Sequence, residues 1–214
     1  MNIRKLIQQG EGTTLDFKRT INNYEKIARS IVAFANHKGG QLLIGVADDG
    51  TIKGVKSEDE ERYMLLRSAQ EFCRPSIDLS FEEVHIEDKI VLVVNIKPSE
   101  TKPHYALDEN KKWWVYFRIQ DKSLLASKIL VDVIKKSTEI QVPQIPPGKE
   151  EKLLFDYLTQ EGRITLKQYS KLLKTSFKKA QKILVAQILC GAIQPHSSEM
   201  EEYFTTIPQQ LQDK

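Results

Sequence analysis

Apolar residues recur at helical spacing near the start of the chain and are followed by a short apolar run. From Ile27 to Ala35 the apolar positions follow the i, i+4, i+7, i+8 pattern of an amphipathic helix within residues 24–36, which Gly39-Gly40 ends. Residues 41–47 are apolar enough for a buried strand. Asp49-Gly50 then predicts a tight turn into residues 51–55, so the pattern indicates a helix followed by a β-hairpin.

The alternation of helical and β-type patterns continues to about residue 137. Residues 58–73 predict a second helix, which Pro75 stops, and residues 124–136 predict a closing amphipathic helix. Three β-rich runs lie between these helices, at residues 79–86, 90–96 and 113–119. This order of elements predicts an α+β domain in which helices pack on a mixed sheet.

A proline-rich stretch, residues 141–148, separates this region from the rest of the chain. It contains three prolines and one glycine, which can continue neither a helix nor a central strand. A length of 214 residues suits one medium and one small domain. We therefore expect an α/β domain at residues 1–140, a linker at 141–148 and a second domain at 149–214.

The second domain has the pattern of three short helices followed by two strands. Residues 150–160 form the first amphipathic pattern, Thr165 can cap a second helix, and Thr175 or Ser176 can cap a third that ends before Gly191. Short β-type runs follow at residues 193–196 and 203–207. Three helices and a two-stranded wing are typical of the winged helix-turn-helix.

The third of these helices carries the candidate DNA contacts. Between Glu161 and Glu199 there is no acidic residue, whereas seven basic residues lie from Arg163 to Lys182. Helical spacing turns Phe177, Ala180, Leu184 and Ile188 toward the core. The residues expected to face DNA are Lys174, Ser176, Lys178, Lys179, Gln181 and Lys182. The alternative is a charged helix face that is only solvated.

Four ordered motifs in the first domain point to a family. They are Glu11-Gly-Thr-Thr-Leu-Asp-Phe-Lys18, Ile31-Val-Ala-Phe-Ala-Asn36 with Gly39-Gly40, Leu43-Ile-Gly-Val46 with Asp48-Asp-Gly50, and Gly54. With Lys102-Pro-His104 and Tyr116-Phe-Arg118, this set resembles the Schlafen-like Alba-type domain over about residues 8–137. In bacteria such domains are commonly joined to C-terminal helix-turn-helix domains in transcriptional regulators. The resemblance therefore implies a DNA-binding regulator.

The resemblance also implies a rival function, because some eukaryotic Schlafen proteins cleave RNA with three carboxylates. Those positions fall on Glu11, Asp16 and Asp48 here, although Asp16 stands where the family usually has glutamate. Converging carboxylates could hold Mg or Mn, and Lys18 could stabilise the same phosphate. The alternative is that Asp16 and Lys18 lie on an exposed strand edge and Asp48 only shapes a turn. A second departure is Gln120, where a glycine commonly follows the arginine strand.

The aromatic run before Arg118 offers a further nucleic-acid contact. Trp113, Trp114, Tyr116 and Phe117 could stack on unpaired bases, and Arg118 could contact a phosphate. Residues alternate between the two faces of a strand, so we expect at least one set of these rings to belong to the core.

Composition excludes several other classes. A net charge of +3 says little by itself, and two cysteines and four scattered histidines provide no disulfide framework and no zinc site. No phosphate-binding G-x-x-x-x-G-K-[ST] motif occurs, and no cofactor is predicted. No apolar run approaches the roughly 18 residues of a membrane span, so we expect a cytoplasmic protein without membrane partners.

Together these patterns predict a transcriptional regulator that binds duplex DNA through its winged helix. Winged-helix regulators usually bind pseudo-symmetric sites as dimers, which makes a homodimer the expected state. The alternatives are the metal-dependent nuclease and a protein-interaction module in which neither domain contacts nucleic acid.

Overall fold

The structure is a computed structural model that describes residues 2–119, 121–137, 148–189, 192–197 and 201–207. Most of the expected linker, together with Gln120 and Cys190, lies outside these residues. The chain divides into two compact units, Met1–Ala126 and Ser127–Lys214. Among the described residues, no helix is both long and apolar enough to cross a membrane.

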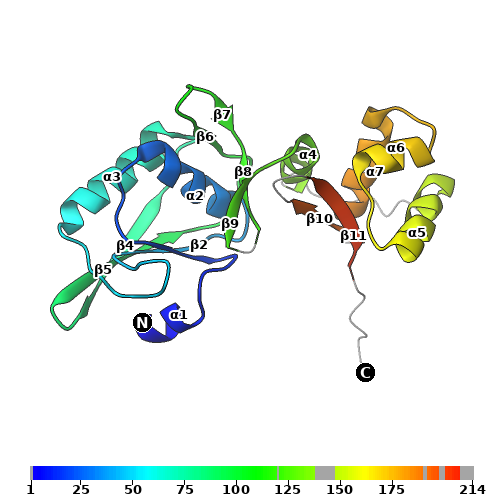
Figure 1. Ribbon diagram of the computed structural model, residues 1–214. Helices are drawn as coiled ribbons and strands as arrows, with labels where there is room; N and C mark the ends of the chain where they lie inside the picture. Colours follow the sequence, from blue (N-terminus) through cyan, green and yellow to red (C-terminus); the bar gives the residue numbers. More distant parts are fainter. Residues whose placement is uncertain (1, 120, 138–147, 190–191, 198–200, 208–214) are drawn as a thin grey trace. The chain divides into compact units, whose positions relative to one another are not determined.

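A four-stranded mixed sheet forms the centre of the first unit (Figure 1). Its strands are β1 (Leu15–Lys18), β2 (Gly40–Ile44), β5 (Lys89–Ile96) and β4 (Leu79–Ile86), in that order across the sheet. β1 and β2 are parallel, whereas β2, β5 and β4 pair in antiparallel fashion. The expected α+β class is therefore confirmed.

Helices cover both faces of this sheet. α2 (Tyr24–Asn36) and α3 (Glu58–Glu71) pack on one face, and the short α1 (Ile3–Gln8) packs on the other (Figure 1). The alternation of side chains along β2 divides the core accordingly. Leu42 joins the cluster with α2, and Leu43 joins the cluster with α1.

The helices begin and end where their capping residues allow. The side chain of Asn23 accepts a hydrogen bond from the Lys26 amide at the start of α2, and Ser57 caps α3 in the same way. At the other end of α2, Gly39 has φ of 72° and its amide donates to the Phe34 carbonyl. A Cβ at Gly39 would lie 2.5 Å from the Ile96 oxygen, so only glycine fits this helix end.

The hairpin predicted after α2 is confirmed only in its turn at Asp49-Gly50, because residues 51–55 form no second strand. β2 pairs with β1 and β5, and the two arms of the expected hairpin share one isolated bridge, from Val46 to Ile52. Gly45 adopts φ of 97°, and its carbonyl accepts from the amides of Lys53 and Gly54. The backbone of this segment is thus satisfied by a compact loop rather than by a second strand.

The predicted strand at residues 113–119 is divided between two small sheets. β7 (Trp113–Trp114) joins β3 (Cys73–Arg74) and β6 (Tyr105–Leu107) in one sheet. β8 (Tyr116–Ile119) pairs with β9 (Lys122–Leu125) in the other, so residues 124 and 125 belong to a strand and not to the closing helix. Both small sheets pack against α2, which is therefore enclosed between the main sheet and this outer layer.

In its described residues, the second unit has four helices and an antiparallel strand pair. The helices are α4 (Lys128–Ser137), α5 (Lys149–Glu161), α6 (Leu166–Leu172) and α7 (Phe177–Leu189), and the strands are β10 (Ile193–Ser197) and β11 (Glu202–Thr206). Ile164 makes an additional bridge to Phe204 of β11. Thr165 and Gln168 form a capping box at the start of α6, which confirms the prediction that Thr165 caps this helix.

α4 belongs to the second unit, although the sequence places it at the end of the first. It packs on α7, its Ile129 is part of the second unit's core, and Asp132 accepts a hydrogen bond from Gln181 at 2.6 Å. An apolar stripe shows that one face of a helix is buried, but it does not show which domain covers that face. The sequence therefore could not assign α4 to the correct unit. The units therefore divide between Ala126 and Ser127, before the proline-rich stretch.

Candidate functional site

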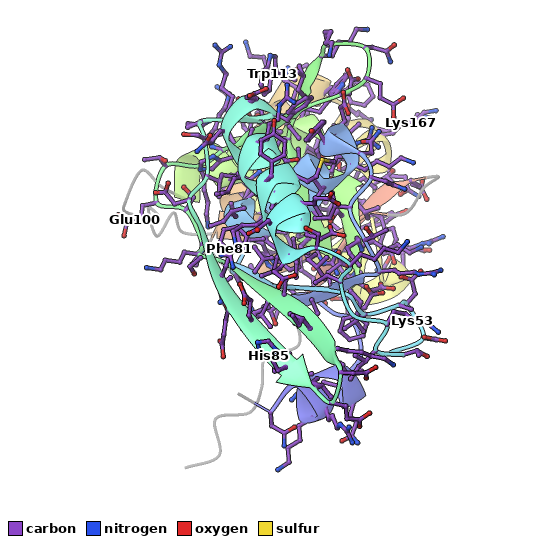
Figure 2. The ribbon with its side chains drawn as sticks, turned by 90° about the vertical axis from the view of Figure 1, so that its left-hand side faces the viewer. Lys53, Phe81, His85, Glu100, Trp113 and Lys167 are labelled. Carbon is purple, nitrogen blue, oxygen red and sulfur yellow. The ribbon has the colours of Figure 1, made fainter. Side chains whose placement is uncertain are left out.

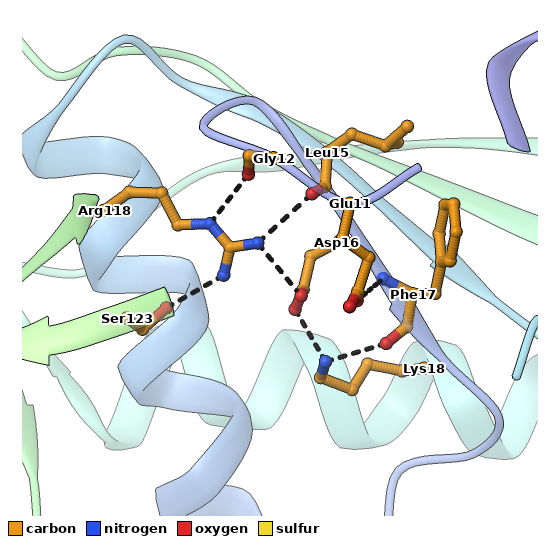
Figure 3. Close-up of polar contacts among 8 residues, drawn as sticks. All are labelled: Glu11, Gly12, Leu15, Asp16, Phe17, Lys18, Arg118 and Ser123. Atoms are coloured by element: carbon orange, nitrogen blue, oxygen red, sulfur yellow. Dashed lines mark hydrogen bonds and ion pairs between the residues drawn. The ribbon is translucent and has the colours of Figure 1, made fainter. Parts of the chain in front are cut away.

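The Asp16 carboxylate lies in the interior of the first unit, between two basic side chains (Figure 3). It is 3% exposed, and its Oδ1 accepts from Arg118 Nη2 at 3.0 Å. Lys18 Nζ lies 2.7 Å from Oδ2 of the same carboxylate, and it also donates to the Phe17 carbonyl. The Lys18 contact is an ion pair without good hydrogen-bond geometry, since Oδ2 has no hydrogen-bond partner.

All three nitrogens of the Arg118 guanidinium group donate hydrogen bonds within the protein. Its Nε donates to the Gly12 carbonyl at 3.0 Å, its Nη2 donates to the Leu15 carbonyl at 3.1 Å, and its Nη1 donates to Ser123 Oγ at 3.2 Å. The group also lies over the Phe34 ring, 4.8 Å from its centroid. Arg118 is only 2% exposed, so the expectation that it contacts a phosphate on the surface is wrong. It joins the outer layer to the loop before β1.

Glu11 lies beside Asp16 and completes the cluster. Its Oε1 accepts from the Phe17 amide at 2.7 Å. Burial raises the pKa of Glu11 above its ordinary value, and the neighbouring Asp16 carboxyl raises it further, while the Phe17 amide and Lys18 act in the opposite direction. We define Glu11, Asp16, Lys18 and Arg118 as the carboxylate cluster.

Asp48 does not join the carboxylate cluster. It is exposed in the turn after Val46, and among the described residues no group of three His, Cys, Asp or Glu side chains is placed to hold a metal. The oxygens of Asp16 already face Arg118 and Lys18, and one Glu11 oxygen already accepts from Phe17. These residues therefore do not fit a Mg or Mn site in this arrangement. Of the three carboxylates expected to converge, only Glu11 and Asp16 lie side by side.

The DNA contacts expected of the predicted third helix lie around the start of α7. Lys174, Ser176, Lys178, Lys179 and Lys182 are exposed, and Ser176 Oγ accepts from the Lys179 amide as the cap of the helix. Lys179 forms an ion pair with Glu150 of α5. Lys174, Lys178 and Lys182 make no ion pair within the described part of the chain. We define these three lysines as the α7 lysine group.

Two expectations about α7 are not met. Phe177 is expected in the core but is 55% exposed, at the first residue of the helix. Gln181 is half-buried and donates to Asp132 of α4, so its amide is engaged within the protein. The sequence gives no sign of this contact, since α4 was placed in the other domain.

The comparison with protein families concerns the first unit. A family model described as Schlafen, AlbA_2 matches residues 11–127. The DIP2311 protein from Corynebacterium diphtheriae is similar in structure, with 18% identity and a TM-score of 0.43 over 61% of this chain and 28% of that chain. The N-terminal domain of a RecG-related protein from Nitrosomonas europaea has 18% identity and a TM-score of 0.43, over 55% of this chain and 86% of that chain. The chain thus spans under a third of the first of these two structures.

Proposed function

The chain belongs to the Schlafen AlbA_2 family, and from this premise we propose that it is a nucleic-acid-binding protein that acts as a transcriptional regulator. In this proposal the second unit is a winged helix that binds duplex DNA through α7. The first unit contributes a second surface for nucleic acid or a partner. The observation that carries the proposal is the exposed α7 lysine group, Lys174, Lys178 and Lys182.

The order of elements in the second unit supports the winged-helix assignment. Three helices, α5 to α7, are followed by the antiparallel pair β10 and β11. Ile164, which lies between α5 and α6, forms an isolated antiparallel bridge with Phe204 of β11. In the winged version of the helix-turn-helix, the helix before the strand pair enters the major groove, and here that helix is α7.

Charge at the start of α7 supports duplex DNA as the ligand. The side chains of Lys178 and Lys182 are four residues apart and both exposed, so they lie on one side of the helix. Lysines in this arrangement can neutralise phosphates on either side of a groove, while the exposed Ser176 hydroxyl can reach a base edge or a phosphate. Lys179 contributes less in this proposal because Glu150 already pairs with it.

A homodimer is part of the proposal, since winged-helix proteins of this type usually bind pseudo-symmetric sites. Multi-angle light scattering of the full chain, with and without duplex DNA, measures the number of copies directly. A single copy in both conditions would remove this part of the proposal and leave DNA binding untouched.

The experiment that tests the function is a gel retardation assay with the full chain. Labelled duplex DNA, single-stranded DNA and structured RNA are each incubated with EDTA and with Mg or Mn. Retarded and intact duplex in every condition is the expected result. Absence of retardation with every nucleic acid would favour the protein-interaction module, and metal-dependent cleavage that Glu11→Ala abolishes would favour the nuclease.

A further inference from the structure

Aromatic rings and cations contact one another in a part of the first unit. The Arg67 guanidinium lies 5.0 Å from the centroid of the Tyr24 ring, and the Tyr24 ring stacks on Phe72 with centroids 5.2 Å apart. Lys111 Nζ lies 6.0 Å from the centroid of Phe72, the other ring of this pair. Each ring of the pair therefore has a cation beside it.

A further cation and ring form a similar pair. Arg74, on β3, lies 5.4 Å from the centroid of the Trp113 ring on β7. The Leu107 amide donates to the Phe72 carbonyl at 3.0 Å, which ties the β6–β7 hairpin to the end of α3. Figure 2 shows Trp113 beside that end of α3. We define Tyr24, Arg67, Phe72, Arg74, Lys111 and Trp113 as the aromatic-cationic row.

The cations of the row are not equivalent. Arg67 is paired with Glu71 at 3.0 Å, which fixes it over Tyr24. Arg74 and Lys111 are exposed and make no ion pair among the residues that the structure describes. Arg74 can therefore leave the Trp113 ring, and Lys111 the Phe72 ring, at little cost in free energy. Each cation can then contact a phosphate while a base stacks on the ring.

We propose that the aromatic-cationic row binds single-stranded nucleic acid, with unpaired bases stacked on Trp113 and Phe72 and phosphates neutralised by Arg74 and Lys111. This inference rests on the proposed nucleic-acid function, for which it identifies the ligand class of the second surface. Neighbouring rings and cations suit a single strand, because every base has a face that can stack while the backbone carries one charge per nucleotide. A duplex offers no such bases, since they are stacked on each other.

The chain offers a direct spectroscopic test, because Trp113 and Trp114 are its only tryptophans. They are neighbours on β7 and point to opposite faces of the strand, and Trp114 is 39% exposed and donates to Asp108 at 2.9 Å. Trp114→Phe leaves Trp113 as the only emitter, and Trp113→Phe leaves Trp114. A single-stranded oligothymidylate is added to each full-length variant at low salt, and tryptophan emission is recorded.

The expected result is that oligothymidylate quenches the emission of Trp114→Phe and leaves the emission of Trp113→Phe nearly unchanged. The affinity, measured by anisotropy of a labelled oligothymidylate, should fall roughly tenfold in Arg74→Ala/Lys111→Ala. The matched control Lys53→Ala/Lys56→Ala removes two exposed cations of the same unit outside the row and should bind as the unchanged protein does. Quenching that follows Trp114, an equal loss in the control, or no binding of the single strand would each overturn the proposal.

The same titration separates this inference from duplex binding by the second unit. Lys178→Ala/Lys182→Ala should weaken retardation of the duplex and leave the quenching of Trp113 unchanged. Quenching of Trp113 in a protein whose duplex retardation is unchanged by Lys178→Ala/Lys182→Ala would remove only the proposed role of α7. Duplex retardation that depends on these lysines, without any quenching of Trp113, would remove only the role of the aromatic-cationic row.

Discussion

Arg118 and Asp16 form a buried ion pair across 102 residues of sequence, with Arg118 Nη2 at 3.0 Å from Asp16 Oδ1. The pair joins β8 in the outer layer to β1 in the main sheet. Both side chains are almost fully buried, and the guanidinium group also donates to the carbonyls of Gly12 and Leu15. The carboxylate cluster is therefore a structural junction between two layers of the first unit.

Arg118→Ala should destabilise the first unit strongly. It leaves the Asp16 carboxylate buried beside Lys18 alone, and truncating one member of a buried pair costs about 3–5 kcal/mol. Urea unfolding followed by tryptophan emission reports on this unit, because both tryptophans lie in it. Arg4→Ala is the matched control, since Arg4 forms an exposed pair with Glu87 at 2.6 Å and its loss should cost about 0–1 kcal/mol. Equal unfolding midpoints for the two variants would contradict the structural role of Arg118.

Glu11→Gln should leave the protein at least as stable as the unchanged chain at pH 7.5. The pKa of Glu11 is raised by burial and by Asp16, so ionised Glu11 costs stability, and this cost grows as the pH rises through the folded-state pKa. The glutamine oxygen can still accept from the Phe17 amide, whereas Glu11→Ala loses that bond and about 1 kcal/mol. Urea midpoints at pH 4 and pH 7.5 measure both effects. A glutamine variant that is less stable only at pH 7.5 would show that the ionised carboxylate is needed.

The sequence predicts most helices and strands of the first unit, but it does not predict which groups its polar side chains contact. The motif from Glu11 to Lys18 is a strand preceded by a tight loop, and the helix at residues 24–36 has the predicted bounds. The partner of Asp16 could not be found in this way, because Arg118 reaches it only after the run at residues 113–119 divides at the buried Val115. Long-range pairing of this kind leaves no local pattern in a single sequence.

For the second unit, the sequence predicts the helices and strands well, but it does not predict which side chains contact one another. The helices α5 to α7 and the strand pair fall close to the expected residues. Lys178 and Lys182 are exposed as expected, whereas Gln181 and Lys179 are engaged by Asp132 and Glu150. Helical spacing gives the face of a residue, but the neighbour across that face depends on which helices pack together.

The pKa of His37 should be about 4 in the folded protein. Burial lowers it first, and the charges of Lys38 and Lys102 lower it further. Because the unfolded chain binds a proton near pH 6.5 and the folded chain does not, stability from this group is lost as the pH falls from about 6.5 towards 4. A proton NMR titration of the imidazole measures the pKa. Lys102→Gln should raise it, and an unshifted value near 6.5 in the unchanged protein would contradict the burial of this ring.

Lys178→Ala and Lys182→Ala should each lower the salt dependence of duplex binding. Each phosphate contact releases about 0.9 counterion, so the slope of log K against log salt should decrease by about 1 per lysine. Lys152→Ala is the control, because Lys152 is also exposed but belongs to α5 and not to the α7 lysine group. Affinities are measured by anisotropy from low to moderate salt. A slope that changes as much in Lys152→Ala as in the α7 variants would remove the special role of this helix.

The place of α4 in the second unit leads to a prediction about where the chain can be divided. A fragment of residues 127–214 retains α4, whose Ile129, Leu130 and Ile134 are each 3% exposed. A fragment of residues 148–214 lacks them and uncovers the side of α7 on which α4 packs. Burial of an aliphatic side chain contributes roughly 1.5–3 kcal/mol, so the shorter fragment should melt at a clearly lower temperature or fail to fold. Circular dichroism of both fragments measures this difference. Equal melting temperatures would instead place α4 outside the second unit's core and restore the boundary that the prolines suggest.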